Sequence, residues 1–402
     1  MKNQISVIFT FGLVMMLAPF AIDLYLPALP TISDQLGTEI DQLEASVAIF
    51  LIGFAAGQLV LGPLSDAIGR MRVLVGGLAI FAVASGIIAT VDSINELFVW
   101  RFVQAVGAAG SVTVFPMVQD RFRQQDAARV ISILMALIIV APLVAPLLGG
   151  YILILAGWPT IFLLLSAFGV VSLLLSFKAS PPSTEPRRRI TLRMLSGQYA
   201  TVLKERRVVL AILTGSFAFG GLFAFVAGSP FVYITYFDVP EERYGLLVGL
   251  NAAAMIIVNL ANASIFAKFP AIGKIAVGAV FLALAGVAML AAALFGQGLV
   301  MVVAVAIVFF AALALVETNA AIVAFSVLQE ENGTVASLNG ALQFGIGGLS
   351  SMLVSTLAST NAVPLAIVMA ASGLAVLLCA VWLVLFDRAS EPGSKSRGSQ
   401  TS

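Results

Sequence analysis

Long apolar runs alternate with short polar connections from one end of the chain to the other. A helix needs about 20 apolar residues to cross the roughly 30 Å hydrocarbon layer of a bilayer, and the runs have that length. They are continuous, without the two-residue alternation of membrane β-barrel strands. The pattern predicts an all-α polytopic membrane protein with twelve transmembrane helices in two six-helix bundles, at residues 5–28, 43–65, 73–91, 96–118, 127–155, 159–178, 208–236, 243–267, 272–294, 298–326, 333–357 and 362–386.

One long polar connection separates the sixth run from the seventh. It opens with serines and prolines and continues through Arg187, Arg188 and Arg189. A basic segment beside the membrane is attracted to the anionic cytoplasmic leaflet, which is the simplest reading of this arginine run. We therefore predict an N-terminal six-helix bundle at 1–178, a cytoplasmic basic linker at 179–207, a C-terminal six-helix bundle at 208–388 and a disordered cytoplasmic tail at 389–402.

The basic residues indicate the orientation of the chain in the membrane. Of the 21 lysines and arginines, all except Arg101 and Arg243 lie in one alternate set of connections and at the two ends. The opposite connections carry mostly aspartate and glutamate. Because basic residues stay on the cytoplasmic side, both termini are predicted to be cytoplasmic.

Composition narrows the possible functions. The 402 residues are 60% hydrophobic and 10% charged, which excludes a soluble multidomain protein. A formal charge of +1 gives no basic surface for nucleic acid. The chain has no histidine and one cysteine, Cys379, so we expect no metal site and no disulfide framework, and carboxylates must carry any protons. We expect a monomer whose partners are the lipid bilayer, protons and a small molecule, with the proton gradient in place of a cofactor.

Three ionisable side chains fall within the apolar runs: Asp23 in the first, Arg101 in the fourth and Glu317 in the tenth. Each costs at least about 2.5 to 3.5 kcal/mol to insert, so we assign all three to proton coupling. Asp23 and Arg101 both lie about 8 Å below the same membrane boundary, at 1.5 Å per residue, and are predicted to meet. Desolvation favours a neutral carboxyl and a nearby arginine favours the ionised one, so Asp23 would be the titrating partner.

The fourth run also carries a stripe of polar and small residues. Helical spacing places Arg101, Gln104, Ala108, Ser111 and Phe115 on one face, which predicts that this face lines a cavity. A second polar cluster in the tenth run joins Glu317 to Thr318 and Asn319. Glu317 could be a second proton site, a contact for a cationic substrate, or a carboxyl that local hydrogen bonds keep neutral.

The connection between the second and third runs reads Gly62-Pro63-Leu64-Ser65-Asp66-Ala67-Ile68-Gly69-Arg70-Met71-Arg72. Its glycines allow a tight turn, and Asp66 and Arg70 are placed to pair with neighbouring helix ends. The stretch resembles the loop between helices two and three of the major facilitator superfamily, with a departure at Ala67, where that family usually has a base. The resemblance implies a conformational switch formed by Gly62, Asp66, Gly69 and Arg70.

Three further stretches strengthen this resemblance across all twelve runs. Residues 97–109 are similar to the fourth-helix motif that the family associates with proton coupling. Residues 141–150 are similar to the fifth-helix motif of its exporters, in which Pro142 and Pro146 bend the helix and Gly149 and Gly150 allow close packing. Residues 23–30 resemble the first helix of drug and proton antiporters of the bicyclomycin and chloramphenicol resistance type.

The resemblance implies proton-coupled efflux of small, largely apolar, drug-like molecules by alternating access in a bacterial inner membrane. A channel would need a ring of selectivity groups, and an enzyme would need a nucleophile with its base or a metal cluster, so we expect neither. An exporter of a physiological metabolite and a proton-coupled uptake symporter remain alternatives. Pro146, Gly149 and Gly150 join the switch residues. The candidate substrate-binding residues are Tyr25, Gln104, Ala108, Phe115, Pro142, Phe217, Tyr233, Asn319 and Phe344.

Overall fold

The computed structural model describes residues 2–122, 124–179, 192–328, 332–357 and 361–390. Within these ranges the chain consists of helices and short turns, without strands. Ten helical stretches of the described residues are long and apolar enough to cross a membrane, and they coincide with ten of the predicted runs. The fifth and eleventh runs correspond to α7 (Gln124–Ala156) and α14 (Asn332–Thr356). The prediction of an all-α polytopic membrane protein is confirmed.

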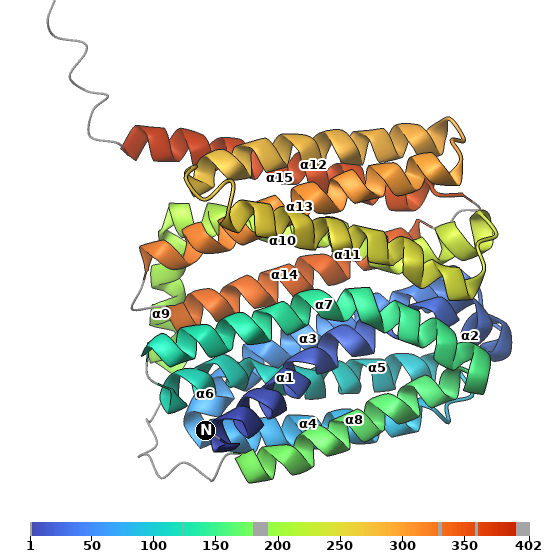
Figure 1. Cartoon of the computed structure of the whole chain (residues 1–402), viewed down its shortest axis with the longest axis horizontal. Coiled ribbons are helices and arrows are strands. Elements are labelled where there is room, and N and C mark those ends of the chain that lie inside the picture. Colours follow the sequence, from blue (N-terminus) through green and yellow to red (C-terminus); the bar gives the residue numbers. More distant parts are fainter. Residues whose placement is uncertain (1, 123, 180–191, 329–331, 358–360, 391–402) are drawn as a thin grey trace, which may run out of the picture.

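The helices follow the predicted order. The first six runs form α1 (Lys2–Asp23), η1 (Leu26–Ala28), α2 (Leu29–Leu36), α3 (Ile40–Ile68), α4 (Arg70–Ile88), α5 (Ile94–Ala108), η2 (Ala109–Thr113), α6 (Val114–Arg121), α7 and α8 (Trp158–Ala179). The last six form α10 (Arg206–Pro230), η3 (Phe231–Tyr236), α11 (Glu241–Ala263), α12 (Ala271–Leu294), α13 (Leu299–Val327), α14 and α15 (Val363–Ser390). Figure 1 shows the first set in blue to green in the lower part of the view and the second set in yellow to red above it.

Two prolines interrupt the first run. Proline has no backbone N–H and fits best in the first turn of a helix, and Pro27 and Pro30 each lie at the start of a short helix, η1 and α2. The long helix α1 therefore ends at Asp23, and the chain bends at Leu24 and Tyr25. The run continues to Leu36, beyond its predicted end at residue 28.

The fourth run is also divided, because a 3-10 segment, η2, separates α5 from α6. At this level the fourth run packs backbone to backbone on α4. A Cβ atom at Gly77 would lie 2.6 Å from the carbonyl oxygen of Gly107, and one at Gly107 would lie 2.5 Å from the amide nitrogen of Phe81. Only glycine permits helices to approach this closely.

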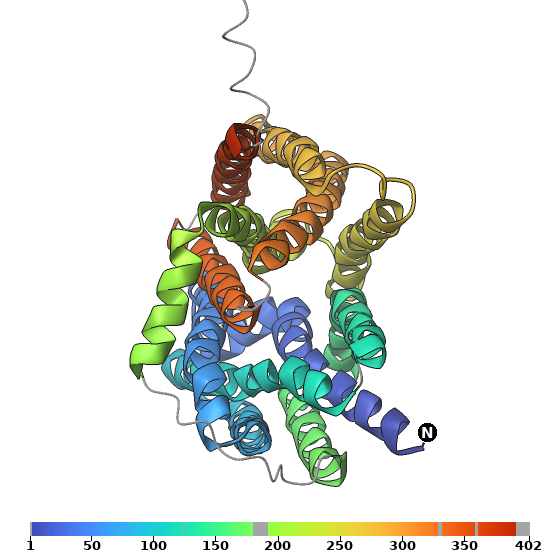
Figure 2. The same ribbon diagram turned by 90° about the vertical axis from the view of Figure 1, so that its left-hand side faces the viewer.

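The predicted linker contains a helix, α9 (Leu192–Lys204), that the sequence analysis did not anticipate. Figure 2 shows α9 in light green along one edge of the molecule, and it packs against α10 and α14. The phenol of Tyr199 hydrogen-bonds to Ser337 at the beginning of α14. Burial raises the pKa of Tyr199, and the hydrogen bond to Ser337 acts in the opposite direction.

The two sets of helices meet along two pairs, α3 with α14 and α7 with α11. We call the end of the molecule at which α1 begins the start face, which lies to the left in Figure 1, and the opposite end the far face. At the far face η1 packs on α10 and α11, and α2 packs on η3. The Thr31 hydroxyl donates a hydrogen bond of 3.0 Å to a Glu241 carboxylate oxygen there. The far end of the first run therefore closes against the second set of helices.

Candidate functional site

Arg101 is a fully buried cation on α5. Its Nη1 donates hydrogen bonds to the carbonyl oxygen of Ala21, at 2.9 Å, and to Oε1 of Gln104, at 2.7 Å. The guanidinium carbon lies 4.4 Å from the ring centroid of Tyr25 and 4.5 Å from that of Phe50, within the range of cation–π attraction. Among the described residues, the Nε and Nη2 groups form no hydrogen bond of ordinary geometry, although the Tyr25 phenol is close enough to interact with the guanidinium. The site thus holds a buried positive charge with spare donors.

The predicted direct contact between Asp23 and Arg101 is not formed. Asp23 is 7% exposed and ends α1, two residues after the carbonyl that Arg101 binds, yet in the described part of the chain no hydrogen bond or ion pair joins the two side chains. The prediction rested on the depth of the two residues in the membrane, which was counted in residues along each helix. Which way the guanidinium points depends on the rings of Tyr25 and Phe50 against which it packs, and the residue count does not contain that information.

Gln104 lies beside Arg101 and connects it to α4. Its Nε2 donates to the Ser85 hydroxyl at 2.8 Å, and this hydroxyl donates to the carbonyl oxygen of Phe81 at 2.7 Å. Four buried polar groups thus form one chain that runs from the guanidinium to the α4 backbone. Because each member is held by the next, the position of Arg101 depends on Gln104.

A 3-10 segment, η2, interrupts the predicted stripe after Ala108. Ala108 is buried and ends α5, but η2 advances by about 120° per residue, against 100° in an α-helix. Five residues of η2 therefore rotate the following segment by roughly 100° relative to a continuous α-helix. Phe115 lies on α6 beyond this rotation and is half-buried. A continuous α-helix would place Phe115 about 40° to one side of Arg101, and η2 moves it to about 60° on the other side, so Phe115 stays within the half of the helix that carries Arg101.

The structure buries a further carboxyl that is not among the predicted proton-coupling residues. Glu44 lies near the start of α3 and is 4% exposed. A sequence signal existed, because Glu44, Val47 and Leu51 share the helical spacing of a buried face, and all three are buried.

Several buried hydroxyl groups lie close to the far face, at about the depth of Glu44. Tyr25 and Ser46 are hydrogen-bonded at 2.9 Å, as are Ser229 and Tyr244. Tyr233 lies in the π-helical turn η3 and is fully buried, and its hydroxyl has no partner among the described residues. Tyr25 and Tyr233, both predicted to line the substrate cavity, thus lie in this buried layer.

Glu317 lies in α13 beside Gln343 of α14, whose Nε2 donates to Glu317 Oε1. The second carboxylate oxygen, Oε2, is buried and has no hydrogen-bond partner in the described ranges. The neighbouring polar residues turn toward α11. Thr318 donates to Oδ1 of Asn259 at 2.6 Å, and Asn319 donates to Oδ1 of Asn262 at 3.2 Å. The predicted cluster therefore divides, with Glu317 facing one way and Asn319 another.

Phe344 is the centre of an aromatic group that crosses between the two sets of helices. Its ring centroid lies 4.5 Å from that of Phe54 in α3, 5.5 Å from that of Phe219 in α10 and 5.9 Å from that of Phe223. Phe217, which was predicted to line the same cavity, is half-buried and has no ring contact with this group. The residues the prediction missed are therefore Phe54, Phe219 and Phe223.

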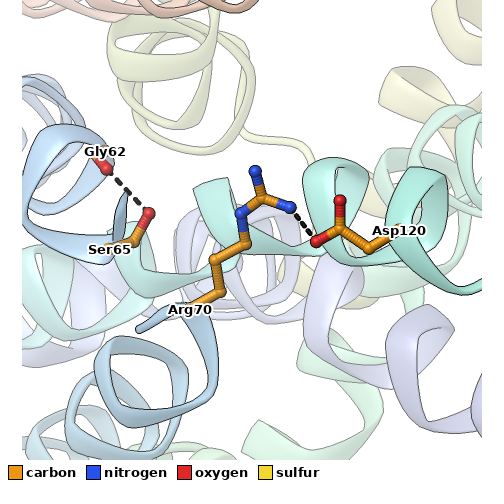
Figure 3. Close-up of polar contacts among 4 residues, drawn as sticks. All are labelled: Gly62, Ser65, Arg70 and Asp120. Carbon is orange, nitrogen blue, oxygen red and sulfur yellow. Dashed lines mark hydrogen bonds and ion pairs between the residues drawn. The ribbon is translucent and has the colours of Figure 1, made fainter. Parts of the chain in front are cut away.

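The predicted switch turn is tight. Gly69 has φ of +105°, a conformation that favours glycine, and it joins α3 directly to α4. Figure 3 shows Arg70 paired with Asp120 at the end of α6, and Ser65 donating to the Gly62 carbonyl at 2.7 Å. The prediction that Arg70 pairs with a neighbouring helix end is confirmed.

Two predicted side chains, those of Asp66 and Pro142, lie outside the described part of the structure. The other fifth-helix residues contact their neighbours through backbone. A Cβ at Gly149 would collide with the carbonyl oxygen of Leu24, next to Asp23, and one at Gly150 would lie 3.3 Å from the carbonyl oxygen of Glu241. Pro146 packs on Gly245 of α11. α7 therefore touches both the break after α1 and the start of α11.

An apolar cavity of about 380 Å³ lies between α1 and α7 and is lined by Ile8, Phe9, Gly12, Leu13, Met16, Ile133 and Leu137. None of the predicted substrate-binding residues lines it. In the part of the chain that the structure describes, no three histidine, cysteine, aspartate or glutamate side chains come together in a way that could hold a metal ion.

The chain is similar in sequence and in fold to known membrane transporters. A family model described as Major Facilitator Superfamily matches residues 11–352. A Bicyclomycin resistance protein homolog of Haemophilus influenzae is 30% identical over 92% of this chain and 94% of its own length. The Multidrug transporter MdfA of Yersinia pestis is 28% identical over 62% of each chain. The crystal structure of a D-xylose-proton symporter has the same fold, with a TM-score of 0.74 at 14% identity, over 95% of this chain and 97% of that one.

Proposed function

Because the chain belongs to the major facilitator superfamily, we propose that it exports small, largely apolar, drug-like molecules in exchange for protons. The relatives named for bicyclomycin resistance and multidrug transport support this substrate class. The single observation that carries the coupling is the buried Arg101, which is bonded to the helix that ends in Asp23 and whose Nε and Nη2 atoms form no hydrogen bond of ordinary geometry within the described part of the chain.

The coupling we propose is a change in the partner of Asp23. A protonated Asp23 is neutral and can stay apart from the guanidinium, as in this structure. When it loses its proton, its carboxylate is attracted to the free N–H groups of Arg101, and α1 must shift at its break to bring the two together. Glu317, with one free oxygen, is the proposed carboxyl of proton coupling in the second set of helices.

The two moving units of the proposed cycle are residues 1–178 and 208–388, joined by the linker 179–207. The far-face contacts, including that between Thr31 and Glu241, would break when the far face opens. The start face carries Arg70, Arg72 and Arg121, so it is proposed to be cytoplasmic, in a bacterial inner membrane. The working unit of the proposed cycle is a monomer. The tail at 389–402 lies almost wholly outside the described residues.

Transport in proteoliposomes with an imposed pH gradient tests the proposal. Asp23→Asn should abolish gradient-driven transport, because an amide cannot exchange the proton, while the amount of folded protein in the membrane stays the same. Asp92→Asn, an exposed acid in a far-face connection, is the matched control and should transport normally. Unchanged gradient-driven transport by Asp23→Asn would contradict the assignment.

A further inference from the structure

A carboxylate with one unsatisfied oxygen lies deep within the second set of helices. Within the part of the chain that the structure describes, Glu317 of α13 accepts one hydrogen bond, from Gln343, and its Oε2 atom is buried without a partner. Gly215 of α10 faces this oxygen closely, because a Cβ atom there would lie 3.0 Å from Oε2 and 3.7 Å from Nε2 of Gln343. A buried acceptor without a donor is costly, so the arrangement suits a ligand that brings N–H groups.

An apolar wall lies one helical turn away. Phe219 follows Gly215 by four residues on α10, which places it on the same face about 6 Å farther along the axis. Its ring contacts Phe344, at 5.5 Å, directly after Gln343 in α14. Both rings are half-buried, so each keeps an accessible part. The carboxylate and the two rings therefore form neighbouring parts of one surface.

The partner helix α3 completes this surface from the first set of helices. Phe54 stacks on Phe344 at 4.5 Å, and Gln58, one turn along α3, packs against Gly340 of α14. Gln58 Oε1 is a further buried acceptor, and none of the described residues donates a hydrogen bond to it. The surface therefore offers acceptor oxygens at one end and aromatic rings at the other, and it spans both moving units.

We propose that Glu317 and Gln343, with Phe219 and Phe344, form a subsite for protonated amines that carry an aromatic or aliphatic body. The ammonium group would donate to Glu317 Oε2, and the apolar body would lie against the two rings. This subsite serves the export proposed above, on whose existence its biological use depends, and it extends the substrates to primary and secondary amines. Quaternary ammonium compounds lack the N–H donors that Oε2 needs and fit less well.

Binding to the purified full chain in detergent tests the subsite with three probes of one shape. These are 2-naphthylmethylamine, the neutral alcohol 2-naphthylmethanol, and the N,N,N-trimethyl derivative of the amine. Charge-assisted hydrogen bonds are the strong ones, so the amine should bind about 10- to 100-fold more tightly than the alcohol. The trimethyl derivative should bind more weakly than the amine. Equal binding of the amine and the alcohol would overturn the proposal.

Two variants separate the polar and apolar parts of the subsite. Glu317→Gln should reduce amine binding to the level of alcohol binding and leave alcohol binding within about twofold. Phe219→Leu should weaken both probes by the same factor. Asp92→Asn serves again as the matched carboxylate control and should change neither. If Glu317→Gln weakens both probes equally, or neither, Glu317 does not bind the ammonium group.

Gly215→Ala provides a test that keeps every charge in place. The added methyl group would lie 3.0 Å from Oε2, so it should lower amine affinity and spare alcohol affinity, and unchanged amine affinity would count against the subsite. Folding is checked by size-exclusion elution. Failure of the subsite and failure of export are distinguishable. Amine preference in detergent without gradient-driven transport of any probe contradicts export alone, and gradient-driven transport without amine preference contradicts the subsite alone.

Discussion

Gly245→Ala should weaken the closure of the far face. Gly245 lies near the start of α11 against α7, and an added Cβ atom would lie 2.7 Å from the amide nitrogen of Leu147 and 2.9 Å from its Cα and from the carbonyl carbon of Pro146. Ordinary contacts of this kind measure 3.4 Å or more, so the helices must separate by more than half an ångström. These are backbone atoms, which cannot move aside as a flexible side chain can.

The cost of such overpacking is about 1 to 3 kcal/mol. The contact joins the two moving units, so this cost falls on the closed far face and is relieved when that face opens. The ratio of far-face-open to far-face-closed molecules should therefore rise about 5- to 150-fold. Substrate affinity should change only through this shift in population.

Cross-linking measures the shift. Cysteines are introduced at Thr31 and Glu241, whose side chains touch across the far face, in a Cys379→Ala background. Gly245→Ala should lower the rate at which a short bifunctional thiol reagent cross-links these two cysteines. Gly76→Ala is the matched control, because nothing lies within 4 Å of the added methyl group. If Gly245→Ala and Gly76→Ala cross-link at the same rate, the reasoning about α7 and α11 is refuted.

Arg101→Lys should lower the free energy of unfolding by about 1 to 3 kcal/mol, because lysine cannot keep both the ring contacts and the hydrogen bonds; thermal unfolding in detergent checks this, and an unchanged Tm would contradict it. Asp120→Asn should cost less than about 1 kcal/mol, because its pair with Arg70 is largely exposed, yet it should slow transport; equal transport rates would make the turn a packing element. Tyr199→Phe, which removes the bond to Ser337, should cost about 0.5 to 1.5 kcal/mol in the same unfolding assay.

The sequence by itself determined the membrane class, the order of the helices and the candidate buried charges. Each of these follows from one-dimensional properties, since about 20 continuous apolar residues define a span and a charge within a span is costly whatever surrounds it. The family resemblance came from local motifs, and the Arg70 pairing followed from the composition of one short turn. The burial of Arg101 was predictable because this residue lies within an apolar run. The placement of Gln104 beside it was predictable because residues three apart lie on one face of a helix.

Only the tertiary structure decided which groups meet. Arg101 packs on Tyr25 and Phe50 and does not contact Asp23, and the five residues of η2 interrupt the helix between Arg101 and Phe115. The free oxygen of Glu317 depends on how α10, α13 and α14 pack together. Contacts between helices depend on rotation and tilt about each axis, and a single 3-10 segment or proline break changes both, whereas hydropathy records only how long each helix is.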